Sequence, residues 1–161
     1  MHAYIYEISC APIDEDSRYS NTDLPDWFHG TIADGTYDTD AEERDLAIDA
    51  IVRVFGENCT YVDGELRFTG DIRERYFRSN FSEFHAAAAT LFVADYRVFS
   101  GQERSVEFTS AMNTLKQAYE EKFDHYIYDK DADELIPMDA WVRDIDLTQS
   151  VFFGGVIDYH W

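Results

Sequence analysis

The sequence contains little cysteine: only Cys10 and Cys59 occur among its 161 residues. Two cysteines cannot form the dense disulfide framework that stabilises many small secreted domains, so the fold must depend on a hydrophobic core. The opening segment MHAYIYEISC also lacks a basic stretch followed by a long apolar stretch, the pattern of a secretory signal. We therefore expect a cytoplasmic protein.

Basic residues are also scarce. The chain has 13 Lys and Arg against 33 Asp and Glu, which gives a formal net charge of -20 at pH 7. A charge of this size repels DNA, RNA and anionic lipid, so free nucleic acid and membranes are poor partner candidates. A basic surface on another protein is a good partner candidate. The general alternative is that the acids serve solubility or adaptation to salt.

The motifs of the common catalytic classes are missing. The chain has no GxSxG, HExxH, phosphate loop or GxGxxG, and its five histidines show no signature spacing to either cysteine. Among 33 acids, some carboxylates lie close together in any fold, so a paired-carboxylate hydrolase gives no specific signal. We predict a protein that is not an enzyme and that needs no cofactor.

Aromatic residues, in contrast, are abundant. Twelve Phe, eleven Tyr and three Trp make up 16% of the chain, far more than a disordered acidic chain contains. The length suits one hydrophobic core, and no repeat or linker divides the sequence. We expect a single domain over residues 1–161.

The least charged part of the chain, Phe81 to Phe99, predicts a long helix in the core. It contains four consecutive alanines, and no Gly or Pro interrupts it before Gly101. A second long helix is expected from Val106 to about Tyr128, with Ser105 as its cap. We expect the two helices to pack as an antiparallel pair.

A shorter acidic helix is predicted over Thr39 to Phe55, because Thr39 and Glu42 match a capping box and Gly56 provides a stop. Its apolar side is expected to carry Leu46, Ile48, Ile51, Val52 and Phe55.

Strand patterns occur near both ends of the chain and around residues 59–70. Residues 3 to 9 predict a central strand, and Asp63-Gly64 predicts a hairpin with a type I′ turn. The segment Cys10 to Asp38 should be irregular, with one short strand at Trp27 to Ile32. After a helical turn following Pro137, two short strands are expected around a turn at Gly154-Gly155. The fold class predicted is α+β, with a small antiparallel sheet of hairpins on the long helix pair.

Two groups of acids are the predicted partner-binding residues. They lie on the outer side of the acidic helix and in a loop near the C-terminus: Glu42, Glu43, Asp45 and Asp49, and Asp129, Asp131, Asp133 and Glu134. Exposed aromatics between acids, such as Tyr19, Trp27 and Tyr159, are typical of interface anchors, whereas Trp141 fits a core position better.

Two metal sites are weaker interpretations. Asp129, Asp131 and Asp133 match the first ligands of a calcium loop, but Glu134 replaces the required Gly and Ala140 replaces the closing Glu. Glu121 and His125 lie one helical turn apart, but a metal site needs further ligands at the same depth. We predict no metal site.

The strand Tyr4-Ile5-Tyr6, the pair Asp26-Trp27, and Arg143-Asp144 ahead of an aromatic C-terminal hairpin resemble parts of the ArdA-type anti-restriction proteins, as do the length and the charge. The resemblance implies a DNA mimic that occupies the basic groove of a nuclease or another DNA-binding, host-defence enzyme. The two acidic groups would then make the contacts. The alternative is a non-catalytic interaction or structural module of a mobile element or phage, whose acids provide only solubility.

Overall fold

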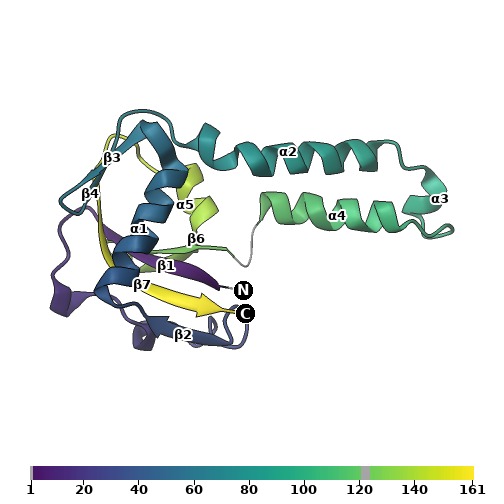
Figure 1. Ribbon diagram of the computed structural model, residues 1–161. Coiled ribbons are helices and arrows are strands. Elements are labelled where there is room, and N and C mark those ends of the chain that lie inside the picture. Colours follow the sequence, from purple (N-terminus) through teal and green to yellow (C-terminus); the bar gives the residue numbers. More distant parts are fainter. Residues whose placement is uncertain (1, 121–123) are drawn as a thin grey trace. The chain divides into compact units, whose positions relative to one another are not determined.

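The computed structural model describes residues 2–120 and 124–161 (Figure 1). The chain divides into two compact units, which we call the sheet unit (Met1–Arg75 and Phe123–Trp161) and the helical unit (Tyr76–Lys122). Within the described residues, no helix has both the length and the hydropathy that crossing a membrane requires. That the chain acts as a single domain stays a prediction.

The sheet unit is built on a seven-stranded sheet, so the α+β class is confirmed and the sheet is larger than expected. The strand order is β3-β4-β7-β1-β5-β6, and β2 also pairs with β7. Strand β1 is central, as predicted. It pairs antiparallel with β7 but parallel with β5, so the prediction of an antiparallel sheet is wrong and the sheet is mixed. The strands are β1 His2–Ser9, β2 Gly35–Asp38, β3 Cys59–Val62, β4 Glu65–Phe68, β5 Tyr126–Asp129, β6 Glu134–Pro137 and β7 Val151–His160.

Helices α1 (Ala41–Phe55) and α5 (Met138–Asp144) cover one face of the sheet. The Tyr6 hydroxyl of β1 donates to the Ala47 carbonyl of α1, and the rings of Phe55 and Trp141 lie 6.2 Å apart. The capping box of α1 uses Asp40 and Glu43, one residue later than predicted, because Thr39 donates its hydroxyl to Val156 O of β7. Gly56 ends the helix with φ of 75°, as expected, whereas Leu46 is exposed.

The irregular segment before β2 covers the other face. Its Leu24, Phe28 and Ile32 pack with Ile5 of β1 and Tyr159 of β7 in one buried cluster. The strand expected at Trp27 to Ile32 is wrong: Phe28 O accepts bonds from the N–H groups of both Ile32 and Ala33, so the chain turns there. The strand of this region is β2 instead.

Two hairpin predictions had opposite outcomes. The β3–β4 turn is confirmed, since Asp63 and Gly64 have φ of 52° and 82°. The turn at Gly154-Gly155 is wrong, because β7 continues through both glycines. A Cβ at Gly154 would overlap the carboxylate of Glu7, which accepts a 2.7 Å bond from the Gly155 N–H. These glycines make room for a buried acid rather than for a turn.

The helical unit consists of α2 (Arg73–Phe92, which begins in the sheet unit), α3 (Tyr96–Phe99) and α4 (Val106–Tyr119). Within it, α2 and α4 run antiparallel, with the rings of Phe84 and Tyr119 6.5 Å apart (Figure 1). The predicted helix Phe81 to Phe99 is two helices, because Asp95 accepts bonds from Arg97 N and Val98 N and starts α3. Packing of the sheet against the helix pair stays a prediction.

Two further predictions for this unit are wrong. The segment Phe81 to Phe99 is not a buried core helix, since Ala87 is the one buried residue of α2. Ser105 caps α4 as expected, but the helix ends at Tyr119 rather than near Tyr128. Residues 121–123 lie outside the described residues, and Tyr126 to Asp129 forms β5, which pairs with both β1 and β6.

Candidate functional site

A cleft of about 510 Å³ brings aromatic and acidic side chains together on the sheet face opposite α1. We call it the aromatic cleft. None of the described residues that line it is basic; they are Tyr19, Asp23, Pro25, Trp27, Tyr128, Asp133, Glu134, Leu135 and Ile136.

The floor of the cleft is a stacked pair of tyrosines. The rings of Tyr19 and Tyr128 are nearly parallel, at 14°, with centroids 3.6 Å apart. The Tyr128 hydroxyl donates to Asp133 Oδ1 at 2.8 Å and the Tyr19 hydroxyl to Asp23 O at 3.0 Å. Burial, and then the Asp23 carboxylate, raises the pKa of Tyr19 to about 12; burial and the Asp133 bond raise the pKa of Tyr128. Both rings are therefore fixed and neutral at pH 7.

The buried carboxylate of Glu7 connects the cleft to the sheet through hydrogen bonds. Its side chain is only 1% exposed, and its Oε2 accepts the backbone N–H groups of Tyr19 at 2.9 Å and Gly155 at 2.7 Å. Lys130 Nζ lies 3.0 Å from Glu7 Oε1 and also donates to Ser17 O. The charge of Lys130 is thus compensated by a buried carboxylate, and it does not neutralise the acids of the cleft.

Trp27 forms an exposed wall of the cleft. Its ring meets Phe28 edge-on at 5.7 Å, and Phe28 is fully buried against Tyr126 and Tyr159. An exposed indole on a rigid support offers a π face to a ligand at little cost in conformational entropy.

The chemistry of the cleft suits a cation. Aromatic faces attract an ammonium or guanidinium group, and carboxylates form charge-assisted hydrogen bonds with it. The described lining residues include no Cys, Ser or His.

The predicted acidic ridge of α1 lies on the opposite face of the sheet. Its four acids are exposed, but they differ in their partners. Glu43 belongs to the capping box, and Asp45 lies 2.7 Å from Arg44 Nη1, while Arg44 is anchored through Nε to Gly154 O. The carboxylates of Glu42 and Asp49 are the ridge charges most accessible to a partner.

The acids of the C-terminal loop stabilise the turn between β5 and β6. Asp129 Oδ1 accepts the N–H groups of Asp131 and Ala132, and Asp131 accepts bonds from Cys10 N and Ser9 Oγ. The Cys10 N–H is the main cause that lowers the pKa of Asp131. The spacing that resembles a calcium loop thus serves hydrogen bonds of the turn, and the described residues contain no cluster of three metal-ligating side chains.

The structure brings Asp133 and Glu134 together with Tyr19 and Trp27, which the sequence also singled out, but separates them from the ridge. Adjacent side chains of β1 show this separation, since Tyr6 contacts α1 and Glu7 lies beneath the cleft. Tyr159 and Trp141 are buried, which confirms the core position of Trp141 and rules out Tyr159 as an exposed anchor.

Of the two residues considered as metal ligands, Glu121 and His125, Glu121 lies outside the described residues. His125 accepts the Tyr4 N–H at Nδ1, at 2.9 Å, and its ring stacks on Tyr4. This histidine has a structural role in the described sheet.

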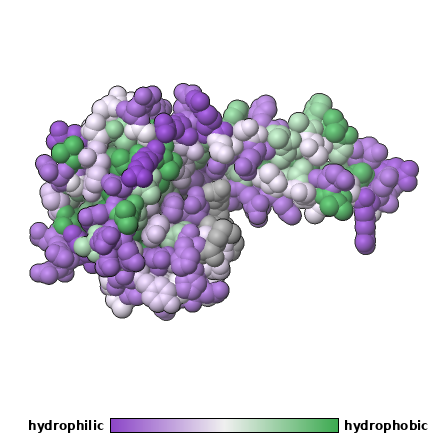
Figure 2. Space-filling view, in the orientation of Figure 1, coloured by the Kyte–Doolittle hydropathy of each residue, from purple (hydrophilic) through white to green (hydrophobic). Residues whose placement is uncertain are grey.

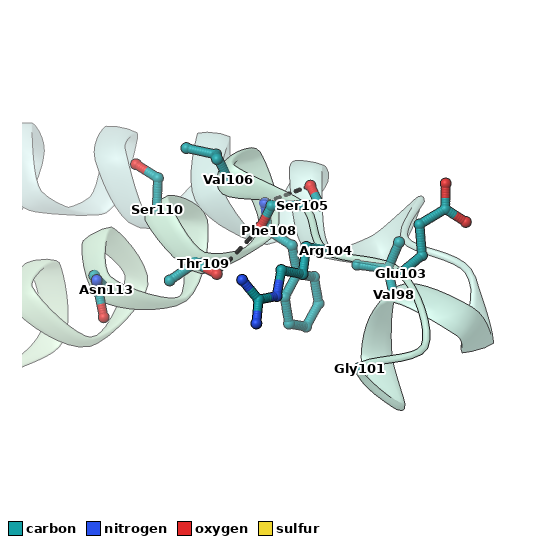
Figure 3. Close-up of a pocket in the computed structure, with 10 residues that line it drawn as sticks. All are labelled: Val98, Gly101, Glu103, Arg104, Ser105, Val106, Phe108, Thr109, Ser110 and Asn113. Atoms are coloured by element: carbon teal, nitrogen blue, oxygen red, sulfur yellow. Dashed lines mark hydrogen bonds between the residues drawn. The ribbon is translucent and has the colours of Figure 1, made fainter.

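A second hollow, of about 680 Å³, lies in the helical unit around the start of α4 (Figure 3). Its polar groups take part in the helix cap: Ser105 Oγ accepts the Phe108 N–H, and Thr109 Oγ1 donates to Ser105 O, both at 3.1 Å. Glu103 lies 3.8 Å from Arg97. These contacts serve the local structure of α3 and α4, and the hollow does not combine carboxylates with stacked aromatic rings as the aromatic cleft does, so the aromatic cleft is the better candidate site.

Comparison of the chain with known protein families, curated proteins and solved structures gave no match.

Proposed function

We propose that this chain is a non-catalytic acidic protein that binds a basic surface of another protein and blocks it. The aromatic cleft receives one Arg or Lys side chain of that surface. The observation that carries the proposal is the cleft itself, where Asp23, Asp133 and Glu134 line the same hollow as the aromatic rings. The nearest basic side chains, Arg18 and Lys130, line an adjoining hollow and are paired with Glu15 and Glu7.

Three modest effects favour binding of a cation in the cleft. A cation against an aromatic face contributes about 0.5–2 kcal/mol, more when it is desolvated. Carboxylates at the rim form hydrogen bonds to the cation that are about twice as strong as neutral ones. The stacked tyrosines are already ordered by bonds to Asp133 and Asp23 O, so binding costs little further entropy.

DNA mimicry is the specific form of this function that we propose. The net charge of -20 supports fast association with a basic groove, because opposite charges attract over long distances. Counterions are released when a polyanion enters such a groove, as they are when DNA binds there. Glu42 and Asp49 of α1, with Glu43 and Asp45, would stand in for phosphates, and the partner would be a nuclease or another DNA-binding enzyme. Binding on this proposal weakens steeply as salt rises.

A second candidate is an interaction module that binds through apolar surface and uses its acids only for solubility. The observation in its favour is the exposed apolar surface of the helical unit, where Phe81, Phe92 and Phe99 are accessible.

Calorimetry with an arginine-rich peptide as the probe tests the cleft. The test variant neutralises the acids of the cleft, and the control neutralises three exposed acids elsewhere in the sheet unit, so both carry the same net charge. The substitutions are Asp23→Asn, Asp133→Asn and Glu134→Gln in the test variant, and Asp14→Asn, Asp16→Asn and Glu57→Gln in the control.

We expect the test variant to bind the peptide at least about tenfold more weakly than the wild type, a loss of about 1.4 kcal/mol. The control should lose much less, because it keeps the aromatic cleft and its acids. Equal losses in both variants would assign the binding to overall charge and refute the role of the cleft. Absence of binding by the wild type at low salt would refute the proposed function.

A further inference from the structure

The helical unit contains an apolar face that the contact between its two long helices covers only in part. On α2, Phe81, Phe84, Ala88 and Phe92 recur at spacings of three and four, so they share one side of the helix. On α4, Phe108, Met112, Leu115 and Tyr119 recur at the same spacings. The two stripes meet where the rings of Phe84 and Tyr119 lie 6.5 Å apart, so they form one surface, which we call the hairpin face.

Four side chains of this face are largely exposed to solvent. Phe81, Phe92, Met112 and Tyr119 are 63%, 90%, 47% and 56% exposed. The buried residues of α2 and α4 are only Ala87, Ala111 and Ala118. Figure 2 shows hydrophobic residues, in green, on the surface of the helical unit. A contiguous apolar surface of this kind on a folded protein marks an interaction site.

Charge identifies the occupant. Residues 76–122 contain six acids and five bases, whereas the rest of the chain contains 27 acids and eight bases. A basic partner would find little attraction on this near-neutral unit. A second copy of the chain, which carries a charge of -20, could approach closely only at a surface where charges balance.

We propose that two copies of this chain associate through the hairpin face, as an isologous dimer whose two helical pairs form a four-helix bundle. Two-fold symmetry brings the same apolar stripe onto itself, and it is the commonest symmetry of soluble oligomers. Each aromatic side chain has about 150–250 Å² to bury, so the exposed members of the face supply several hundred Å² per copy. That is the scale of the roughly 800 Å² per partner in stable complexes.

The dimer is independent of the proposed binding function, and salt distinguishes the two. Binding of a basic partner weakens as salt rises, whereas an apolar dimer of acidic chains strengthens because the repulsion between copies is screened. Loss of one property therefore leaves the other measurable.

Sedimentation velocity of the full chain, over a range of concentrations and under reducing conditions, tests the proposal. The test variants are Phe92→Glu on α2 and Met112→Glu on α4. Val106→Glu is the matched control, since Val106 is 81% exposed and lies two positions from Phe108, on the opposite side of α4.

The wild type should show a concentration-dependent dimer that is stronger at about 1 M than at about 0.15 M salt, where the Debye lengths are about 3 and 8 Å. Phe92→Glu and Met112→Glu should each weaken the dimer at least about tenfold, with unchanged helical circular dichroism, whereas Val106→Glu should not. A chain that stays monomeric at all concentrations and both salts would overturn the proposal. So would a dimer that the test variants and the control affect equally.

Discussion

Glu7 is the residue on which the sheet unit depends most. Its carboxylate is buried and joins three parts of the chain, through Tyr19 N, Gly155 N and Lys130 Nζ. Its removal leaves two backbone N–H groups without their acceptor and the partly exposed Lys130 without its counter-charge, and together these losses cost about 3–5 kcal/mol. We therefore expect Glu7→Ala to lower the free energy of unfolding by about that amount, measured by urea denaturation.

Glu42→Gln is the control for this prediction, because Glu42 is exposed on α1 and should change the free energy of unfolding by less than about 0.5 kcal/mol. Glu7→Gln keeps one acceptor oxygen, so its free energy of unfolding should lie between those of Glu7→Ala and Glu42→Gln. A Glu7→Ala protein as stable as the Glu42→Gln protein would show that the buried carboxylate does not stabilise the fold.

The glycine beside this carboxylate gives a second prediction at the residue scale. Gly154→Ala places a methyl group against Glu7 Oε2 and Ile13 Cδ1, without any strain from φ. We expect the overlap to destabilise the protein by about 1–3 kcal/mol, as overpacking does elsewhere. Thermal unfolding measures the loss, and an unchanged melting temperature would contradict the close contact.

His125 makes stability depend on pH. Burial lowers the pKa of its imidazole below the ordinary value of 6.5, and its Nδ1 must be unprotonated to accept the Tyr4 N–H. The unfolded chain therefore binds a proton more readily than the folded one, so the contribution of His125 is present above about pH 6.5 and is lost as pH falls towards the folded pKa.

The matched variant is His125→Asn, which keeps an acceptor for the Tyr4 N–H but does not titrate in this range. Between pH 7 and 5, the wild type should lose stability more steeply than the variant, by at most about 1.4 kcal/mol per pH unit for one proton. Urea denaturation at each pH gives the two slopes. Equal slopes would contradict the assignment.

Among the elements, the helical unit should be the least protected against opening. Its two long helices bury only three alanines, whereas β1 and β7 are buried over most of their length. Local opening free energy follows buried apolar contacts, so amides of α2 and α4 should exchange hydrogen at least about tenfold faster than those of β1 and β7 in dilute protein. Mass spectrometry of peptides measures this, and uniform protection would refute it.

Hydrogen-exchange protection of the helical unit should also depend on protein concentration. If the hairpin face dimerises, protection of α2 and α4 should rise with protein concentration while that of β1 and β7 stays constant. A uniform change over the whole chain would instead indicate a different association.

Local signals in the sequence predicted the elements whose geometry is set by a few neighbouring residues. The Asp63-Gly64 turn, the stop at Gly56 and the Ser105 cap were correct because each depends on a single backbone conformation or bond. The Gly154-Gly155 turn was wrong because its cause, the carboxylate of Glu7, is distant in sequence. Exposure of Phe92 could not be predicted, since low charge does not reveal which side of a helix is covered.

The candidate site was predicted in part for the same reason. Tyr19, Trp27, Asp133 and Glu134 were noted from their exposed, acidic surroundings, and the structure places them in one cleft. Tyr128 was missed because it was assigned to a helix rather than to β5, whose alternation directs it towards Tyr19.

At the scale of the whole molecule, charge is distributed unevenly between the two units. The acids belong overwhelmingly to the sheet unit, while the helical unit is almost neutral and has the exposed apolar face. Basic partners should therefore be attracted to the sheet unit, and copies of the chain should meet at the helical unit.

Competition with duplex DNA tests the central claim most directly. Fluorescence anisotropy of labelled DNA on a restriction endonuclease, titrated with this protein, measures whether the acidic chain takes the place of DNA in a basic groove. We expect displacement of the DNA, and an affinity of the protein for the enzyme that falls by at least about tenfold between about 0.05 and 0.2 M salt. Failure to displace DNA at the lower salt, or binding that does not change with salt, would contradict the account.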